Sequence, residues 1–383
     1  MADIKPAVFT LIDIKSNKFG AIEEYSLALS TLLFQRGSFG AVGLTGNTPE
    51  WLQKQFTAQG ISILTLPAPN RPWAFIHSLR KILRLNRINI LHATFFPTYD
   101  FRLILSTIGS RCRLIHSDQC SRKGHPNTSL FSPLRFIRNK VLQQFIHTVI
   151  ADAEFIKSCQ INDMNMPRDK LKVIYNGVNT TRFAPSHNGK SGYILQEFDL
   201  PDDSKIIVCI AQLIPEKGVV YLIEAVAQLM HQYPRLYVFL VGEGPQRDEL
   251  QLKVQQLGLQ DHIHFTGIRI DTESILAVAD IFVLLSIWEE AFAFSLLEAM
   301  ATGCPVVATR IGAIPESVIH QETGLLVPPR DAAAAAQAIH YLLDHDHERE
   351  QMGRAARKRV EDHFSLERWI SETIQLYEEI LQN

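Results

Sequence analysis

Short apolar runs alternate with longer amphipathic segments along almost the whole chain. Short apolar runs predict buried strands, whereas apolar positions repeating at helical spacing predict helices. In the first half, strands are predicted at 7–12, 41–44, 61–66, 88–92, 113–116, 148–151 and 172–175. The clearest helical patterns between them cover 23–35, 73–85 and 134–146.

A second series of the same kind follows. Its strands are predicted at 205–210, 236–241, 262–265, 281–285, 306–308 and 325–327, and its helices at 219–233, 247–257, 295–301 and 332–343. Fully apolar strands that alternate with helices are typical of parallel sheets covered on both faces. Two series therefore predict an α/β chain with two doubly wound, Rossmann-like domains.

The aperiodic segment APSHNGKSG (184–192) separates the two series and predicts a hinge there. We therefore expect domains at 1–185 and 190–365. Two further helices are predicted beyond the last strand, at 348–362 and 366–382. The last of them, 366–383, is expected to pack back on the first domain.

Composition places the chain among ordinary globular proteins. The chain has 383 residues, of which 46% are hydrophobic and 20% are charged, which excludes a disordered or fibrous protein. The five cysteines form no C-x-x-C pair, which favours a reducing compartment. The first residues do not read as a signal peptide, and no apolar run approaches the ~20 residues that span a bilayer. The sequence predicts a soluble, cytoplasmic protein.

Charge is distributed unevenly. Residues 1–190 carry 24 Lys and Arg against 11 Asp and Glu, or +13, and residues 191–383 carry 14 against 29, or −15. Residues 71–140 hold 13 basic residues and only two acids. Such a region suits an anionic partner, for which phospholipid headgroups, a phosphorylated acceptor and nucleic acid are candidates. A solvated basic face without a partner is the alternative.

Segment 75–89 shows how this region could meet a membrane. Arg80, Arg84 and Arg87 share one side of the predicted helix, and apolar residues including Ile76 occupy another. A peripheral membrane helix has this pattern, and so does an ordinary helix that covers a sheet. Nucleic acid fits less well, because no aromatics are interleaved at stacking spacing.

The strongest local signal for chemistry is the segment 281–309. An apolar strand ends near Ser286, a loop carries Glu290, and a helix begins near Phe294. A helix that begins at the carboxyl end of a strand directs backbone N–H groups and a positive dipole end at one spot, which suits a diphosphate. Ser295 adds a hydroxyl, and Glu290 and Glu298 could accept hydrogen bonds from sugar hydroxyls on either side. The alternative is that both glutamates are surface carboxylates.

These motifs together resemble the family 4 glycosyltransferases, which have the two-domain GT-B fold. The resemblance rests on the spacing from Glu290 to Glu298 and on six stretches: FGAIEE (19–24), VIYNGVNTTRFAP (173–185), AQLIPEKGVVYLIEAV (211–226), LVGEGPQRDEL (240–250), HFTGIR (264–269) and EAMATGCPVVAT (298–309). It covers nearly the whole chain.

The resemblance implies roles for individual residues. Glu298 would hold the ribose hydroxyls of the donor, Glu290 the hydroxyls of its sugar, and Lys217 its diphosphate. Further donor contacts are implied for Gly20, Gln212, Gly267, Ile268, Arg269, Ala293, Phe294 and Ser295, with the base against 267–269 read mainly by main chain. His116, at the end of its predicted strand, resembles a histidine beside the donor sugar, although a structural core histidine is the alternative. The implied catalytic residues are His116, Lys217 and Glu290, and His92 is expected to be structural.

Four positions depart from the family pattern. Gln212 stands where the family usually has arginine, so one cation on the diphosphate is missing. Ala291 and Ala293 replace loop glycines, and an alanine at 293 would be strained if the site required a positive φ. Ala21 replaces the second glycine of the first turn. Because of these departures, the sequence does not define which donor is bound. To a lesser degree, they also leave undecided whether the protein is catalytically active.

The resemblance therefore implies a metal-independent transferase that needs no cofactor. The expected substrate is a UDP- or GDP-linked sugar, whose hexosyl group would move to an acceptor with retention of configuration. The acceptor is expected to be a glycan or glycolipid, lipid-linked or part of the cell envelope, and the protein to be peripheral at the inner face of the membrane. Glu290 and Glu298 are not expected to act as a glycosidase pair. A degenerate, non-catalytic scaffold and a sugar-nucleotide epimerase are the alternatives.

Overall fold

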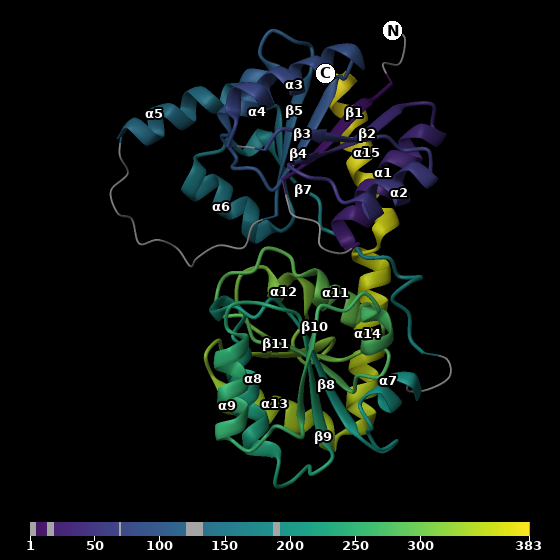
Figure 1. Cartoon of the computed structure of the whole chain (residues 1–383). Coiled ribbons are helices and arrows are strands. Elements are labelled where there is room, and N and C mark those ends of the chain that lie inside the picture. Colours follow the sequence, from purple (N-terminus) through teal and green to yellow (C-terminus); the bar gives the residue numbers. More distant parts are fainter. Residues whose placement is uncertain (1–4, 14–18, 69, 120–132, 187–191, 383) are drawn as a thin grey trace. The chain divides into compact units, whose positions relative to one another are not determined.

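The computed structural model describes residues 5–13, 19–68, 70–119, 133–186 and 192–382, with side chains described outside 133–136 and 192. The chain forms two compact units (Figure 1). Among the described residues, the first unit runs to Tyr175 and includes Glu367 onward, and the second spans Asn176–Leu366. Both units are α/β with a parallel sheet, which confirms the predicted fold class.

The chain passes between the units at Tyr175, ten residues before the predicted end of the first domain at 185. The backbone of Val178 explains this position. Its amide donates to the Phe364 carbonyl (2.9 Å) and its carbonyl accepts from the Leu366 amide (2.9 Å). This pairing attaches the segment after Asn176 to the second unit. Residues 187–191 of the predicted hinge lie outside the described residues.

The first unit contains a seven-stranded parallel sheet in the order β3-β2-β1-β4-β5-β6-β7. The strands are β1 (Ala7–Ile12), β2 (Phe39–Thr45), β3 (Ile63–Leu66), β4 (Ile90–Thr94), β5 (Arg113–Asp118), β6 (Thr148–Ala151) and β7 (Leu171–Val173). The helices are α1 (Ala21–Gln35), α2 (Glu50–Ala58), α3 (Pro72–Leu85), α4 (Phe101–Thr107), α5 (Pro133–Leu142), α6 (Glu154–Met164) and α15 (Leu366–Gln382).

Two pairs of helices cover the faces of this sheet. Buried residues of α3 and α4, among them Phe75 and Leu103, form one core with alternate positions of the central strands. On the other face, Tyr25 of α1 stacks on Trp369 of α15 with ring centroids 3.6 Å apart, and its hydroxyl donates to Thr373 (3.0 Å). The final helix therefore belongs to the first unit.

The second unit contains a six-stranded parallel sheet in the order β10-β9-β8-β11-β12-β13. The strands are β8 (Lys205–Ile210), β9 (Leu236–Val241), β10 (Ile263–Gly267), β11 (Ile281–Leu284), β12 (Val306–Thr309) and β13 (Gly324–Val327). The helices are α7 (Gly192–Glu197), α8 (Val219–Leu229), α9 (Arg247–Gln256), α10 (Thr272–Leu276), α11 (Phe294–Ala301), α12 (Ile314–Ser317), α13 (Ala332–Asp344) and α14 (Asp346–His363).

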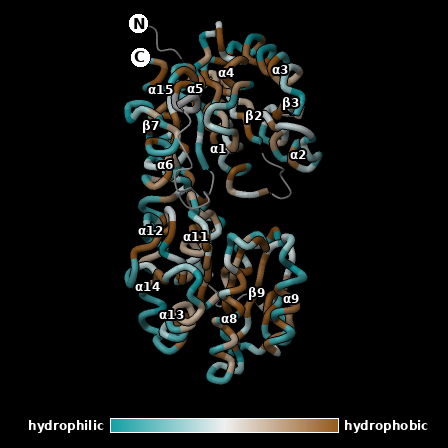
Figure 2. Tube along the Cα trace, turned by 90° about the vertical axis from the view of Figure 1, so that its left-hand side faces the viewer, coloured by the Kyte–Doolittle hydropathy of each residue, from teal (hydrophilic) through white to brown (hydrophobic). Residues whose placement is uncertain are grey.

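The strand order reverses between β8 and β11. From β8 the chain proceeds to β9 and β10 on one side, and from β11 to β12 and β13 on the other. Because such crossovers are right-handed, the two halves place their helices on opposite faces. Figure 2 shows hydrophobic residues concentrated along inner segments such as β9 and α8, and Val238 and Val226 of these elements belong to one core.

Some element boundaries differ from the predicted ones. The strand predicted at 88–92 is Ile90–Thr94, and the one predicted at 113–116 continues to Asp118, because Ser117 and Asp118 pair with β6. The helix predicted at 134–146 ends as α5 at Leu142 and continues as one 3-10 turn, Gln143–Phe145. Among the described residues, no helix is long and apolar enough to cross a membrane.

Candidate functional site

The loops that follow β8 and β11 lie side by side in the second unit, because these two strands are neighbours in the sheet. In an open parallel sheet, ligands bind outside the carboxyl ends of the strands, where the strand order reverses. The loop after β8 carries Gln212 and Lys217, and the loop after β11 carries Glu290. The structure thus places on neighbouring loops three of the residues predicted to contact the donor, two at its diphosphate and Glu290 at its sugar.

Glycines without room for a side chain hold these loops against each other. Gly218 has a φ of +61°, and a Cβ there would lie 2.1 Å from the carbonyl oxygen of Leu285. A Cβ at Gly242, after β9, would lie 2.0 Å from the carbonyl oxygen of Ala211. The Ile287 amide also donates to the Glu216 carbonyl (2.8 Å), which ties the two loops together through backbone. The loop containing Lys217 is therefore held on both sides.

Lys217 and Glu290 form the central contact of the site. Lys217 Nζ lies 2.6 Å from Glu290 Oε1, and the Ser286 hydroxyl donates to the same oxygen (2.5 Å). The Glu290 side chain is 6% exposed and that of Lys217 is 22% exposed. Glu290 is therefore not the surface carboxylate of the alternative interpretation. The ammonium group, in contrast, retains access to a ligand.

Two residues that the sequence analysis did not select complete this arrangement. Ser286 lies two residues after β11 and is fully buried, and its carbonyl accepts from the Thr309 hydroxyl (2.7 Å). Gly312 has a φ of +55°, and a Cβ there would lie 2.4 Å from the Glu290 carbonyl oxygen. The Ala313 amide donates to that same oxygen (3.0 Å). The backbone of Glu290 is thus held by the loop after β12 as well as by its own loop.

Helix α11 begins directly after this loop. Its N-cap, Ala293, has a φ of −75° and a ψ of 107°, and it supplies no side-chain hydrogen bond to the helix. The strain anticipated for an alanine at 293 is therefore absent, because the position is ordinary extended backbone. Phe294 and Ser295 occupy the first two helical positions, where amides point out of the helix end. Glu298 follows one turn later and is half-buried.

The residues predicted at the nucleobase follow β10. Gly267 has a φ of +71°, and its carbonyl accepts from the Gly242 amide (2.8 Å), so this turn adjoins the loop after β9. Ile268 is 50% exposed. The Arg269 guanidinium is bound to Asp271 (2.9 and 2.8 Å) and Glu197 (2.9 Å), and hydrogen bonds to these two acids raise its pKa above the usual value. Its side chain is thus occupied by protein, which leaves the main chain for a ligand.

Gly20 and His116 belong to the first unit. Gly20 is the N-cap of α1 with a φ of −111°, and its amide donates to Glu23 Oε2 (3.0 Å). Ala21 is the first residue of α1, where a Cβ is normal. The prediction that His116 ends its strand is wrong: His116 lies within β5, is 2% exposed, and is followed by two more paired residues.

His92 is a structural residue, as expected. It lies within β4 and is 1% exposed, and its ring nitrogens lie 2.6 Å from the Tyr377 hydroxyl and 2.6 Å from the Ser117 hydroxyl. Burial, with a smaller contribution from His116, lowers the pKa of His92 to about 3. A neutral ring that bridges the sheet and α15 is a packing element of the first unit.

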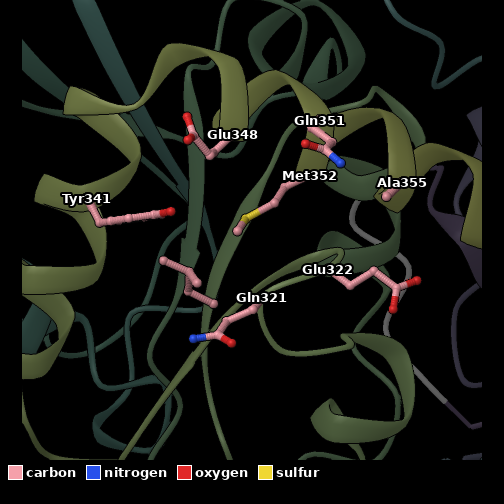
Figure 3. Close-up of a pocket in the computed structure, with 8 residues that line it drawn as sticks. Gln321, Glu322, Tyr341, Glu348, Gln351, Met352 and Ala355 are labelled. Carbon is pink, nitrogen blue, oxygen red and sulfur yellow. The ribbon is translucent and has the colours of Figure 1, made fainter.

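Two further observations concern ligands in the described part of the chain. It contains no group of three or more His, Cys, Asp or Glu side chains arranged to hold a metal ion. A cavity of about 550 Å³ lies between α13, α14 and the segment before β13, where Tyr341, Glu348 and Met352 line it (Figure 3). None of the predicted donor residues lines this cavity, so it is separate from the site around Lys217 and Glu290.

Sequence comparisons place the chain among known proteins. Residues 193–359 match the family described as glycosyl transferases group 1, and residues 45–182 match glycosyltransferase family 4. The chain is 30% identical over 307 residues to an uncharacterized glycosyltransferase of Methanocaldococcus jannaschii, covering 77% of this chain and 76% of that protein. It is 26% identical over 318 residues to N-acetyl-alpha-D-glucosaminyl L-malate synthase of Bacillus anthracis. That alignment covers 81% of this chain and 80% of that protein.

Solved structures agree with this placement at the level of the fold. A glycosyltransferase from Rickettsia africae has a TM-score of 0.84 at 22% identity, with 99% of both chains covered. A protein of Anabaena, solved in complex with UDP, has a TM-score of 0.79 at 20% identity, with 97% of this chain and 99% of that chain covered. These likenesses identify the fold as the predicted GT-B fold.

Proposed function

We propose a function from the premise that this chain belongs to the family 4 glycosyltransferases. In this proposal it transfers a hexosyl group from a nucleoside diphosphate sugar to a cell-envelope glycan or lipid-linked acceptor. Membership makes the chain a glycosyltransferase. The single observation that carries the proposal is the contact between Lys217 and Glu290 at the strand-order reversal, beside the start of α11.

The proposed donor is a UDP- or GDP-linked sugar. A structural neighbour was solved with UDP, and a relative that is 33% identical over 212 residues is a GDP-mannose-dependent mannosyltransferase of Mycolicibacterium smegmatis. That alignment covers 53% of each protein. In our proposal Glu298 binds the ribose, Glu290 the sugar hydroxyls, and the 267–269 main chain the base.

The proposed chemistry depends on stabilising the diphosphate as it leaves. Lys217 supplies a mobile cation, and the first amides of α11 supply oriented donors with the positive end of the helix dipole. Gln212 is exposed at the carboxyl end of β8 and contributes an amide where the family usually has a second cation. We assign His116 a role beside the donor sugar. In our proposal the transfer retains the anomeric configuration and needs no metal ion.

The proposed acceptor is a membrane-linked or cell-envelope glycan. One relative is a putative colanic acid biosynthesis glycosyltransferase of Escherichia coli, 34% identical over 215 residues. The basic region 71–140 supports contact of the first unit with an anionic membrane surface at the cytoplasmic side. No nucleic acid enters this proposal.

The test is a donor panel assayed with the full chain. We expect free UDP or GDP to be released from one sugar nucleotide in the presence of an oligosaccharide or glycolipid acceptor, with equal rates after EDTA treatment. NMR of the product should show the anomeric configuration of the donor. An altered sugar still attached to its nucleotide would establish an epimerase, and binding without turnover would establish a degenerate scaffold.

A further inference from the structure

Arg269 is the centre of a cluster of side chains at the turn that follows β10. Its Nε and Nη2 donate to the two oxygens of Asp271 (2.9 and 2.8 Å). Its Nη2 also donates to Glu197 Oε2 (2.9 Å), and its Nη1 donates to Glu197 Oε1. The Tyr193 hydroxyl donates to Asp271 Oδ2 (2.7 Å). We call Arg269, Asp271, Glu197 and Tyr193 the Arg269 cluster.

The cluster connects the turn to α7, which carries Tyr193 and Glu197. This short helix is itself fixed on the sheet. The side chain of Ile194 is fully buried, and Phe198, the residue after α7, packs against Phe239 of β9 with ring centroids 4.6 Å apart. The Arg269 cluster therefore attaches the turn to a packed element.

A second arginine holds the same turn from another segment. Arg182 lies in the segment that follows Asn176, and its Nη2 donates to the Ile270 carbonyl (3.2 Å) and to Glu273 Oε2 (2.8 Å). The main chain of the turn is thus held both through the side chain of Arg269 and directly at Ile270. Such support is what a loop needs if its peptide groups are to bind a ligand in one geometry.

The carboxylates that adjoin the turn are already occupied. Glu243 is one of them, because a Cβ at Gly267 would lie 3.2 Å from its Oε1. Four such carboxylates form ion pairs with arginine: Glu197 and Asp271 with Arg269, Glu273 with Arg182, and Glu243 with Arg247. Hydrogen bonds from Arg269 hold the pKa of Asp271 and that of Glu197 below their usual values, so both stay ionised and paired at neutral pH. None of the four is left to accept from a base.

Nucleobases differ in what a main chain alone can satisfy. The pairing edge of uracil presents one N–H beside carbonyl oxygens, so one peptide carbonyl and one peptide N–H match it. Guanine presents two adjacent donors, on N1 and N2, and a free carboxylate accepts from both at once. Where the carboxylates are paired, guanine loses that acceptor, and an unpaired donor in a binding site lowers affinity.

We propose that the Arg269 cluster positions the 267–269 main chain and, by occupying the neighbouring carboxylates, makes the site select uracil over guanine. Arg269 and Glu197 are then positioning residues, because they act through the main chain and their side chains do not bind the base. This inference rests on the proposed function and narrows its donor to a UDP-linked sugar.

The test is calorimetric titration of the full chain with UDP, GDP and inorganic pyrophosphate. We expect the wild type to bind UDP at least tenfold more tightly than GDP. Arg269→Gln should bind UDP at least tenfold more weakly and pyrophosphate within twofold of the wild type, because the diphosphate is assigned to Lys217 and α11. Its preference for UDP over GDP should also shrink, because Glu197 and Asp271 become free to accept from guanine.

Two further variants control this experiment. Arg349→Gln removes an arginine that is 12% exposed and paired with Asp346 in the same unit, whereas Arg269 is 19% exposed. It should bind all three ligands as the wild type does. Glu197→Gln keeps the contact between Arg269 and Asp271 and applies if Arg269→Gln does not fold. It should bind UDP about fivefold more weakly and leave pyrophosphate binding unchanged.

Three results would overturn the inference. The first is equal affinity of the wild type for UDP and GDP, or a preference for GDP. The second is unchanged binding of UDP in Arg269→Gln and Glu197→Gln. The third is an equal loss of UDP and pyrophosphate binding in these variants, which would show a general effect on the second unit. A preference for GDP would leave the proposed transferase function standing, whereas a wild type that bound no nucleoside diphosphate would overturn that function as well.

Discussion

Replacing Lys217 by glutamine should affect stability and activity by separable amounts. The Lys217 ammonium lies 2.6 Å from Glu290 Oε1. The Lys217 side chain is 22% exposed and the Glu290 side chain is 6% exposed. Exposed ion pairs contribute ~0–1 kcal/mol, and breaking a fully buried pair costs ~3–5 kcal/mol. For this half-buried pair we expect the free energy of unfolding to fall by about 1–2 kcal/mol, or a Tm decrease of about 3–6 °C for a unit of this size.

The loss of activity has a different origin. A charge-assisted hydrogen bond to phosphate contributes ~1.5–3 kcal/mol, so kcat/KM for the donor should fall about 10- to 150-fold. The double variant Lys217→Gln/Glu290→Gln separates the two effects. It no longer buries an unpaired carboxylate, so its Tm should return toward that of the wild type, whereas its activity should stay low.

Thermal unfolding and release of nucleoside diphosphate, both measured on the wild type and the three variants, provide the readouts. Glu290→Gln alone is the control for the loss of the carboxylate. If the double variant recovered activity together with Tm, Lys217 and Glu290 would form only a structural pair. That result would refute the assignment of Lys217 to the diphosphate.

Four other predictions follow from the same structure. Glu298→Ala should raise the donor KM at least tenfold, because it removes the hydrogen bonds proposed for the ribose; an unchanged KM in a donor titration would remove the ribose assignment. Gly312→Ala should lower the free energy of unfolding by more than ~2 kcal/mol in urea titration, because it adds left-handed strain and a contact 2.4 Å from the Glu290 carbonyl. Burial lowers the pKa of His92 to about 3, so below pH 6.5 the unfolded chain takes up a proton that the folded chain does not. The wild type should then lose about 1.4 kcal/mol of stability per pH unit between pH 6.5 and 3 relative to His92→Gln, and parallel pH profiles would contradict this. EDTA should leave the rate of transfer unchanged in a stopped assay, and a rate restored only by added Mg²⁺ or Mn²⁺ would contradict metal independence.

The sequence predicted the bounds of several strands correctly where the pattern of apolar residues was clear. The strands 7–12, 148–151, 205–210 and 236–241 agree with the structure at both ends, and each is a short, mostly apolar run. The short helix α4 was not predicted. Its signal was the N-cap Asp100, whose side chain accepts from the Arg102 amide, but seven residues are too few to show helical periodicity.

Only some residues of the candidate site could be predicted from the sequence. Lys217, Glu290 and Glu298 were selected from their motifs, but Ser286 and Gly312 were not. Ser286 is significant because its hydroxyl donates to Glu290, and Gly312 because its missing side chain leaves room for the Glu290 backbone. The Gly312 contact joins loops that follow neighbouring strands, and the Ser286 contact depends on how the loop after β11 folds back over four residues. Neither can be recognised from the pattern of hydrophobic and polar positions. The strand position of His116 was wrong for the same reason, since pairing with β6 extends β5 to Asp118.

The most direct test of a nucleotide-binding site around Lys217, Glu290 and α11 is calorimetric titration of the full chain with UDP, GDP and ADP, repeated with Glu298→Ala. We predict that UDP or GDP binds at one site per chain and that the variant binds it at least tenfold more weakly. Absence of binding by all three diphosphates, or equal affinity in the variant, would contradict the account.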